Sequence, residues 1–318
     1  MKIIIYSYRK DEAAFIEQFR KKYTVELVLS KEPPTLENVH LASGCDCISI
    51  VTTPMDSALL DKFKAIDVRY ISTRTIGYEH IDIAHAKIIG IEVGNVSYSP
   101  NTVAEYTVML MLMSLRKVNT LLERSKVQDY SLKNLQGKEL RNQTVGVIGT
   151  GRIGETVINI LNGFGCHIMA YDLYEKDHLK DHVHYVPFDQ LLKESDIITM
   201  HLPATEDNQH LINKKTIQLM KDNVLLINTS RGTLIHTNDL IDAIENQKIG
   251  GAALDVIENE KDIFYKDFKY KIVNHKPLAL LKSYPNVIIT PHTAFYTDQA
   301  VSDMIEHSII QCLDFMNK

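Results

Sequence analysis

A glycine-rich loop follows a β-branched run near the middle of this chain. Residues 144–154 read Thr-Val-Gly-Val-Ile-Gly-Thr-Gly-Arg-Ile-Gly, which predicts a strand, a G-x-G-x-x-G turn and the start of a helix. Gly149 would allow the tight turn out of the strand, Gly151 would let a pyrophosphate approach the backbone, and Gly154 would let the helix pack close to the sheet. Because a helix start presents unpaired N–H groups and the positive end of its dipole, the loop predicts a dinucleotide site.

An acidic residue at the tip of the next predicted strand supports this interpretation. Asp172 follows the predicted strand 167–171, where a carboxylate would accept hydrogen bonds from the hydroxyls of an adenosine ribose. The same carboxylate would repel a 2′-phosphate, and no arginine follows it in residues 173–176. We therefore expect NAD(H) rather than NADP(H), with Arg152 and Ile153 completing the binding loop. A glycine-rich turn that binds no ligand is the alternative.

Polar residues also follow the other predicted strands of the second half of the chain. Ligands of open parallel sheets bind beyond the carboxyl ends of the strands, so these positions are candidates for a site. They are His201 and Pro203 after strand 196–200, Thr229, Ser230 and Arg231 after 224–228, Asp255 with Glu258 and Glu260 at the end of 251–255, and His292 after 287–290. We expect an arginine, several carboxylates and two histidines at one edge of the sheet.

This set of side chains fits reversible hydride transfer between a nicotinamide and a 2-oxo acid. Histidine can donate a proton to a carbonyl oxygen near neutral pH. A carboxylate beside it favours the protonated imidazole and fixes its orientation. An arginine offers a planar fork of donors to the substrate carboxylate and can stabilise charge on the carbonyl oxygen. These groups already supply proton transfer and electrostatic stabilisation, so we expect no metal site.

The elements that must position these residues alternate between β-rich runs and helical patterns, which predicts an α/β fold with parallel sheets. We expect two doubly wound, Rossmann-like or flavodoxin-like domains with a cleft between them. A substrate-binding domain would comprise residues 1–99 plus 296–318, and an NAD-binding domain residues 100–295. The predicted strands of the first are 3–7, 25–29, 47–51, 70–73 and 92–94, with helices such as 12–22 and 57–65 between them; those of the second are 144–148, 167–171, 183–186, 196–200, 224–228, 251–255 and 287–290. The last helix, 297–316, is expected to return to the first domain.

A predicted helix over 102–117 is apolar around most of its circumference, so it is buried on nearly all sides. It would pack either between the domains or against a second subunit, and we favour a homodimer.

The composition excludes several classes of protein. A net charge of −5 over 318 residues gives no basic surface for nucleic acid or for an anionic membrane. The longest apolar run, 108–113, is too short to span a bilayer, and the first residues predict a strand rather than a signal peptide. Four cysteines suit a reducing cytoplasm. We interpret Cys45 and Cys47 as small residues entering a buried strand, and the histidines at 178, 182 and 184 as surface residues, rather than as metal ligands.

Several segments together resemble the D-isomer-specific 2-hydroxyacid dehydrogenases, and the D-lactate dehydrogenase branch in particular. They are 71–77 with 80–82, 98–101 with 104–105, 228–232, 255–260 and 291–296. Some are also similar to the D-lactate dehydrogenases of vancomycin-resistance clusters. The resemblance covers essentially the whole chain.

The resemblance implies roles for individual residues. Arg231 would bind the substrate carboxylate and polarise the carbonyl, His292 would be the acid/base, and Glu260 its partner. The backbone N–H groups around Ile76 and Gly77 would also hold the carboxylate. The remaining implied contacts are Tyr98 and Phe295 for the substrate side chain, and Pro203, Thr229 and Asp255 for the cofactor, with Asp255 near the nicotinamide. The family also implies a homodimer through the 102–117 helix.

These observations predict an NAD-dependent D-2-hydroxyacid dehydrogenase that reduces pyruvate to D-lactate. Bulkier 2-oxo acids such as 2-oxoisocaproate or phenylpyruvate are the alternative, because Ile50 and Val51 end a strand where the substrate side chain should point. A dinucleotide-sensing protein like the corepressors built on this fold is a more distant one.

Three residues carry minor expectations. Asn259 replaces the glycine usual between the two acids, so we expect the local turn to differ. His201 is expected to have a structural or cofactor-contact role, and Glu258 to be solvated or to lie behind the residues that contact ligand.

Overall fold

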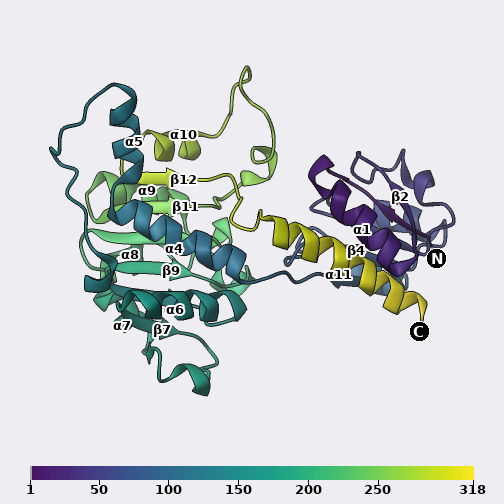
Figure 1. Cartoon of the computed structure of the whole chain (residues 1–318), viewed down its shortest axis with the longest axis horizontal. Coiled ribbons are helices and arrows are strands. Elements are labelled where there is room, and N and C mark those ends of the chain that lie inside the picture. The colour runs from purple at the N-terminus through teal and green to yellow at the C-terminus, as the bar shows by residue number, and fades with distance from the viewer. Residues whose placement is uncertain (1) are drawn as a thin grey trace. The chain divides into compact units, whose positions relative to one another are not determined.

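The computed structural model describes residues 2–318, and the chain divides into two compact units (Figure 1). Unit 1 contains the described residues up to Ser99 together with Tyr296–Lys318, and unit 2 is Pro100–Phe295.

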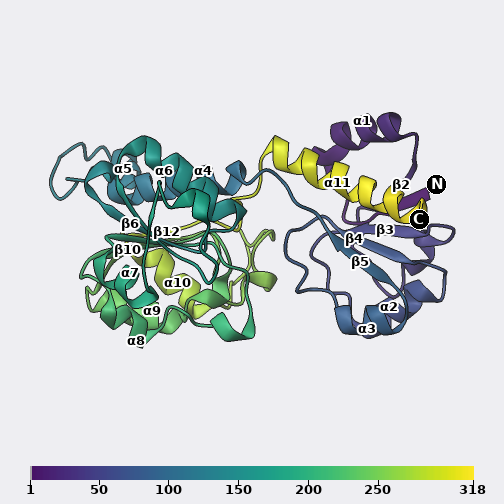
Figure 2. The ribbon, with the colours of Figure 1, turned by 90° about the horizontal axis from the view of Figure 1, so that it is seen from below.

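Unit 1 is a five-stranded sheet with helices on both faces. The strand order is β2 (Glu26–Leu29), β1 (Lys2–Ile5), β3 (Cys47–Ile50), β4 (Tyr70–Thr73) and β5 (Glu92–Asn95), and each pairing is parallel. Figure 2 shows α1 (Ala13–Tyr23) and α11 (Asp298–Met316) on one face, and α2 (Ser57–Lys64) and α3 (Ile83–Ile88) on the other. Two short 3₁₀ helices, η1 (Lys10–Glu12) and η2 (Val39–Ala42), complete the unit.

The strands of unit 1 form where short runs of β-branched residues can be covered on both faces. Ile3, Ile4 and Ile5 are fully buried, and all of β3 is buried. Covering both faces is what allows a parallel sheet to be built from nearly continuous apolar runs. Cys45 and Cys47 are buried at the start of β3, as the sequence predicts.

Unit 2 is a seven-stranded parallel sheet in the order β12-β11-β10-β9-β6-β7-β8. The strands are β6 (Thr144–Ile148), β7 (His167–Tyr171), β8 (His184–Tyr185), β9 (Ile197–Met200), β10 (Val224–Asn228), β11 (Ile249–Leu254) and β12 (Val287–Ile289). The helices are α4 (Asn101–Leu115), α5 (Val118–Lys126), α6 (Arg152–Phe164), α7 (Phe188–Glu194), α8 (Lys214–Leu219), α9 (Thr237–Glu245) and α10 (Lys276–Ser283). The short 3₁₀ helices are η3 (Leu140–Asn142), η4 (Asp177–Leu179), η5 (Glu206–Asn208), η6 (Gly232–Leu234) and η7 (Glu260–Asp262).

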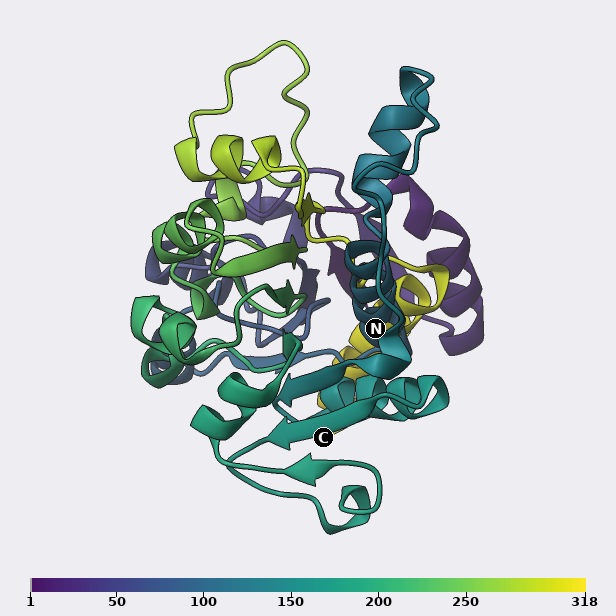
Figure 3. The same cartoon turned by 90° about the vertical axis from the view of Figure 1, so that its left-hand side faces the viewer.

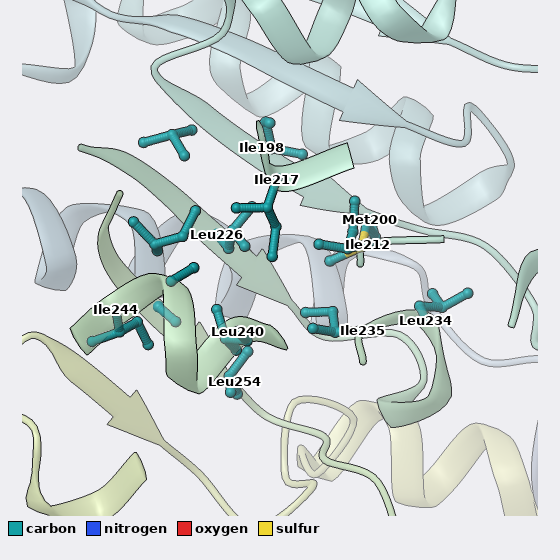
Figure 4. Packing of buried hydrophobic residues seen from close by; sticks show 14 of the residues in the cluster. Ile198, Met200, Ile212, Ile217, Leu226, Leu234, Ile235, Leu240, Ile244 and Leu254 are labelled. Carbon is teal, nitrogen blue, oxygen red and sulfur yellow. The ribbon is translucent and has the colours of Figure 1, made fainter. Parts of the chain in front are cut away.

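Two apolar layers enclose this sheet. On one face, residues such as Ile198, Leu226 and Leu240 pack among the strands and α7 to α10 (Figures 2 and 4). On the other face, α4 and α6 cover the sheet through residues that include Met111 and Ile158. Each fully buried side chain of this size contributes about 1.5–3 kcal/mol, so the sheet is a rigid base for the loops at its edge.

The structure confirms the predicted fold class, two parallel-sheet α/β domains, and it corrects several element boundaries. The helix predicted over 102–117 ends at Leu115, because Lys117 takes a left-handed conformation with φ of 51°. Helix α5 was not predicted; it has no buried residue, and Figures 1 and 3 show it projecting from the sheet with the segment that follows. Helix α11 packs against α1, β3 and β4.

Candidate active site

The strand order of unit 2 brings the predicted site residues into one row along the carboxyl edge of the sheet. In the order β12, β11, β10, β9, β6 and β7, the strands are followed by His292, Asp255 with Glu260, Arg231, His201, the glycine loop and Asp172. His292, the two acids and Arg231 therefore lie on three adjacent strand ends, and the glycine loop and Asp172 lie on two further ones.

A different steric observation explains why each of the three loop positions is a glycine. Gly149 has φ of +92°, a conformation that favours glycine, and its N–H donates to the carbonyl of Tyr171 at 2.8 Å. A Cβ on Gly154 would lie 2.0 Å from the Gly149 carbonyl oxygen. A Cβ on Gly151 would meet no atom within 4 Å, so the backbone in front of α6 is open to a ligand. An open backbone at a helix start fits a pyrophosphate.

Asp172 is held by donors of the same loop. One oxygen accepts from the backbone N–H of Thr150 at 2.6 Å and from its hydroxyl at 3.1 Å, and the other accepts from the N–H of Tyr174 at 3.0 Å. Desolvation opposes its ionisation, but the hydrogen bonds from Tyr174 and Thr150 outweigh it and lower the pKa of Asp172. The carboxylate is thus an oriented anion, as recognition of ribose hydroxyls requires. Thr150 and the Tyr185 hydroxyl that donates to it were missed, because Thr150 occupies a variable position of the motif.

The other predicted cofactor contacts divide into exposed and buried groups. Arg152 begins α6 and Pro203 follows β9, both exposed, whereas Ile153 packs against the core below the loop. Thr229 is buried, and its hydroxyl lies 2.7 Å from that of Thr107 on α4. The hydroxyl of Thr229 therefore links the edge of the sheet to α4 by a hydrogen bond.

His201 supports the glycine loop from the neighbouring strand. Its carbonyl would lie 2.6 Å from a Cβ on Gly149, and its Nε2 is 3.0 Å from the Thr199 hydroxyl. Desolvation lowers the pKa of His201 to about 3, so the ring is neutral at physiological pH. A neutral histidine that packs beneath the loop has a structural role, one of the two expected.

Arg231 lies in a turn that Asn228 closes. The fully buried Asn228 side chain accepts from the N–H of Ser230 at 3.0 Å and donates to the carbonyl of Arg231 at 2.9 Å. The Arg231 guanidinium donates to the carbonyl of Ser230 at 2.9 Å. A Cβ on Gly232 would lie 2.1 Å from the backbone of Ile257, so this turn is pressed against the loop that leads to Glu260.

His292 and Glu260 form a close pair. The His292 Nδ1–H donates to Glu260 Oε1 at 2.5 Å, and the other carboxylate oxygen accepts from the N–H of Ile257 at 2.8 Å. Both side chains are partly exposed, at 31% for His292 and 21% for Glu260. The pairing leaves Nε2 as the ring nitrogen that faces away from Glu260, and the ring of Phe295 lies 6.3 Å away in an edge-on arrangement.

Asp255 is fully buried and holds the segment that carries His292. Its carboxylate accepts from the Thr290 hydroxyl at 2.6 Å and from the N–H groups of Thr293 and Ala294 at 2.9 Å each. Its backbone carbonyl accepts from the N–H of His292 at 2.8 Å. Asp255 therefore anchors the segment 290–294, a structural role that the sequence did not suggest.

The turn between the two acids and the surroundings of Glu258 define the acidic loop. Asn259 has φ of 59°, the left-handed conformation that glycine favours and that asparagine tolerates. Glu258 is not solvated: its side chain is 19% exposed and accepts from His210 and from the N–H and hydroxyl of Thr237. Desolvation opposes its ionisation, but the hydrogen bonds from Thr237 and His210 prevail and lower the pKa of Glu258.

The predicted substrate residues of unit 1 lie after β4 and β5. The carbonyl of Ile76 accepts from the Asn95 side chain at 2.7 Å and that of Gly77 from the Thr75 hydroxyl at 2.6 Å, which orients both peptide groups. Tyr98 is half-buried in the segment after β5.

Arg74 and the pair at the end of β3 complete this part of unit 1. Arg74, fully buried just before the Ile76 segment, donates to the Tyr6 carbonyl and to the Ser49 hydroxyl, both at 2.9 Å. Ile50 lies wholly in the core, so of the pair expected to face the substrate only Val51 is partly exposed.

The comparisons with known proteins agree with this geometry. A sequence model described as "D-isomer specific 2-hydroxyacid dehydrogenase, NAD binding domain" matches residues 108–294. The chain belongs to the D-isomer-specific 2-hydroxyacid dehydrogenase family. It is 43% identical over 314 residues to a D-specific alpha-keto acid dehydrogenase of Enterococcus faecium, covering 98% of this chain and 96% of the relative. It is 44% identical over 320 residues to an aromatic 2-oxoacid reductase of Clostridium sporogenes, covering 99% and 96%. The solved structure of a D-lactate dehydrogenase from Treponema pallidum superimposes with a TM-score of 0.92 at 34% identity, covering 100% of this chain and 97% of that one.

Family membership makes this dehydrogenase an NAD-binding oxidoreductase, and the glycine loop and Asp172 are the residues that fit NAD. Within residues 2–318, no helix is long and apolar enough to cross a membrane. The same part of the chain contains no group of three or more His, Cys, Asp or Glu side chains arranged to hold a metal ion. His178, for example, pairs at the surface with Glu155 at 3.0 Å.

Proposed function

We propose that this dehydrogenase reduces pyruvate to D-lactate with NADH, and oxidises D-lactate in the reverse direction. The observation that supports it most is the hydrogen-bonded pair of His292 and Glu260 on the strand ends next to Arg231. The choice of pyruvate is supported by the similarity to the D-lactate dehydrogenase of Treponema pallidum over the whole chain.

His292 is the proposed proton donor. When bound, the nicotinamide cofactor supplies the hydride. The Nε2 of protonated His292 gives its proton to the carbonyl oxygen, and in the reverse direction it takes the hydroxyl proton back. Glu260 holds Nδ1 and stabilises the positive charge of the imidazolium before transfer. The pair therefore fixes both the direction of the ring and its charge.

Arg231 is proposed to bind the substrate carboxylate and to polarise the carbonyl. Its guanidinium matches the two carboxylate oxygens, and Asn228 fixes the turn that carries it. Ile76, Gly77, Tyr98 and Phe295 are proposed as further substrate contacts. Ile153, Arg152 and the three loop glycines are proposed to hold the pyrophosphate, with Asp172 on the ribose, and Pro203, Thr229 and Asp255 are proposed as further cofactor contacts.

A bulkier 2-oxo acid is the second candidate substrate. The similarity to the aromatic 2-oxoacid reductase of Clostridium sporogenes, at 44% identity, favours it as strongly as the overall match favours pyruvate. NADH oxidation with pyruvate, 2-oxobutyrate, 2-oxoisocaproate, phenylpyruvate and oxaloacetate separates the two. A highest kcat/KM for pyruvate supports the lactate proposal. A highest value for 2-oxoisocaproate or phenylpyruvate replaces it, and no turnover despite tight NADH binding favours a sensing protein.

We also propose a homodimer built through α4. Val108, Met109, Leu112 and Met113 of α4 line an apolar groove together with Phe164 of α6. The adjoining α5 segment exposes further large apolar side chains, namely Leu121, Leu122, Val127, Tyr130 and Leu132. An apolar surface of this extent is typical of a subunit interface. Light scattering should give twice the chain mass for the wild type. Met109→Lys should shift the mass toward that of one chain, and an unchanged dimer would place the interface elsewhere.

A reducing, cytoplasmic location is proposed from the cysteines. All four are free thiols, and three of them, Cys45, Cys47 and Cys312, are buried. Thiols at these positions suit a compartment in which disulfides do not form.

A further inference from the structure

The turn that follows β11 holds His292 at two separate points. Glu260 at the start of this turn binds the imidazole Nδ1, and Tyr265 at its end donates its hydroxyl to the backbone carbonyl of His292 at 2.7 Å. The two rings lie 6.2 Å apart between centroids. The side chain and the peptide group of one residue are thus fixed by a single segment, 259–265, near the base of the loop between β11 and α10 (Figure 1).

Both partners of the backbone contact have uncommon conformations. Tyr265 has φ of 65° and His292 has φ of 53°. For residues with a Cβ this region costs roughly 1–2 kcal/mol, and it persists only where the surroundings impose it. For His292 the constraint is visible, because its N–H donates to the carbonyls of Asp255 and Thr290 at 2.8 and 3.0 Å.

The conformation of Tyr265 follows from the residue before it. Phe264 is buried in the core of unit 2, and its N–H donates to the carbonyl of Glu260 at 2.9 Å. With Phe264 directed inward, the left-handed turn at the next residue brings the Tyr265 hydroxyl back to His292. The position of the hydroxyl is therefore set by the same segment that sets Glu260.

Burial in the core does not explain why residue 265 is a tyrosine. Its side chain is 63% exposed, so the ring contributes little to the core, and water could replace its hydroxyl at the His292 carbonyl with little loss of stability. The peptide that carries this carbonyl is held on its N–H side by Asp255, to which Thr293 donates at 2.9 Å, and the Tyr265 hydroxyl holds its other side.

We propose that Tyr265 is a positioning residue for His292: its hydroxyl holds the peptide in the orientation that aims Nε2 at the carbonyl oxygen of the substrate. The proposal rests on the acid/base role of His292 proposed above. A misplacement of about 1 Å at a reacting group can cost on the order of 10²-fold in rate, so a partial loss of orientation should cost about 10-fold. The loss should fall on kcat, with KM for the 2-oxo acid changed less than about twofold, because Tyr265 acts on the proton donor and not on Arg231.

Matched variants test it. Tyr265→Phe removes only the hydroxyl, and Tyr270→Phe is the control, because Tyr270 lies in the same loop and is 98% exposed. Tyr265→Asn keeps a residue that tolerates the left-handed conformation but cannot supply the hydroxyl. We expect kcat to fall about 10-fold in both Tyr265 variants, with melting temperatures close to that of the wild type, and no change in Tyr270→Phe. A wild-type kcat in Tyr265→Phe would overturn the proposal, and a loss in Phe that Asn restores would assign the effect to the turn instead of the hydroxyl.

A second measurement does not depend on turnover. The ring signals of His292 can be identified in a histidine NMR spectrum by their absence from His292→Gln. Tyr265→Phe should shift or broaden those signals, and Tyr270→Phe should not. If the wild type reduces no 2-oxo acid, the proposed function fails, and this spectrum still decides whether Tyr265 orients His292: unchanged signals in Tyr265→Phe would overturn the proposal.

Discussion

Replacing Gly154 by alanine should damage both the stability of unit 2 and its affinity for NADH. The new Cβ would lie 2.0 Å from the carbonyl oxygen of Gly149 and 3.0 Å from its carbonyl carbon. Non-bonded heavy atoms prefer roughly 3.5 Å, so the loop or α6 must move by about 1.5 Å. The obstacle is the backbone of Gly149 at the end of β6 and not a flexible side chain, so it cannot easily move aside. Overpacking of this kind costs about 1–3 kcal/mol, which lowers the melting temperature of a unit of this size by roughly 2–12 °C. Because this glycine loop is the proposed pyrophosphate site, a shift by that distance should weaken NADH binding at least about 10-fold.

Two other glycines of the same segment separate the effects. A Cβ on Gly163, near the end of α6, meets no atom within 4 Å, so Gly163→Ala should leave both properties intact or raise stability slightly. A Cβ on Gly151 also meets no protein atom within 4 Å, but it would occupy the proposed pyrophosphate site. Gly151→Ala should therefore keep its melting temperature and lose NADH affinity. Thermal unfolding and titration of NADH fluorescence measure the two properties. Wild-type values of both for Gly154→Ala would refute the steric argument, and wild-type NADH affinity in Gly151→Ala would refute the placement of the pyrophosphate.

Four further predictions concern single residues of unit 2. His292→Gln should lower kcat by at least about 10²-fold with NADH affinity unchanged, and an undiminished kcat would count against His292 as donor. Arg231→Lys should raise KM for the 2-oxo acid and lower kcat, each by about 10-fold, because a point charge cannot reproduce the fork; retained kcat/KM would contradict that role. Asp172→Ser should reduce the preference for NADH over NADPH by about 10-fold in kcat/KM, and a wild type equally efficient with both would remove the basis of this prediction. Desolvation holds the pKa of His201 at about 3 in the folded state, below its ordinary value of 6.5, so between these values the unfolded state binds the extra proton and stability falls as the pH decreases. Urea unfolding should show a loss of about 1.4 kcal/mol between pH 8 and pH 5.5 in the wild type that is absent from His201→Gln, and equal losses in both would contradict the burial argument.

The elements that could be predicted from the sequence are those whose pattern is local. Strands 144–148, 167–171 and 224–228 are apolar runs bounded by turn residues, and the structure has the same bounds. Helix α5 escaped prediction because none of its residues is buried in unit 2. The predicted end of α4 lies two residues beyond the observed one, Leu115. The residue types do not indicate that Lys117 takes a left-handed conformation.

The candidate site likewise contains residues that could be predicted from local patterns and contacts that could not. The glycine loop and Asp172 belong to one strand–turn–helix–strand pattern, so their positions could be inferred residue by residue, but the bond of Asp172 to Thr150, 22 positions away, could not. The hydrogen bonds of Asp255 join it to residues 35–39 positions away, and those of Glu258 join it to residues 21 and 48 positions away. Pairing across such distances depends on strand order, which residue types do not specify. The contact of Tyr265 with His292, 27 positions apart, is of this kind.

The most direct test of the proposed chemistry is to follow NADH consumption with each 2-oxo acid of the panel and to determine the configuration of the product by chiral chromatography, for the wild type and for His292→Gln. We predict stoichiometric formation of the D-2-hydroxy acid by the wild type, fastest with pyruvate, and loss of at least about 10²-fold in rate for the variant. An L-product, or undiminished turnover in His292→Gln, would contradict the assignment of the proton donor and of the reaction.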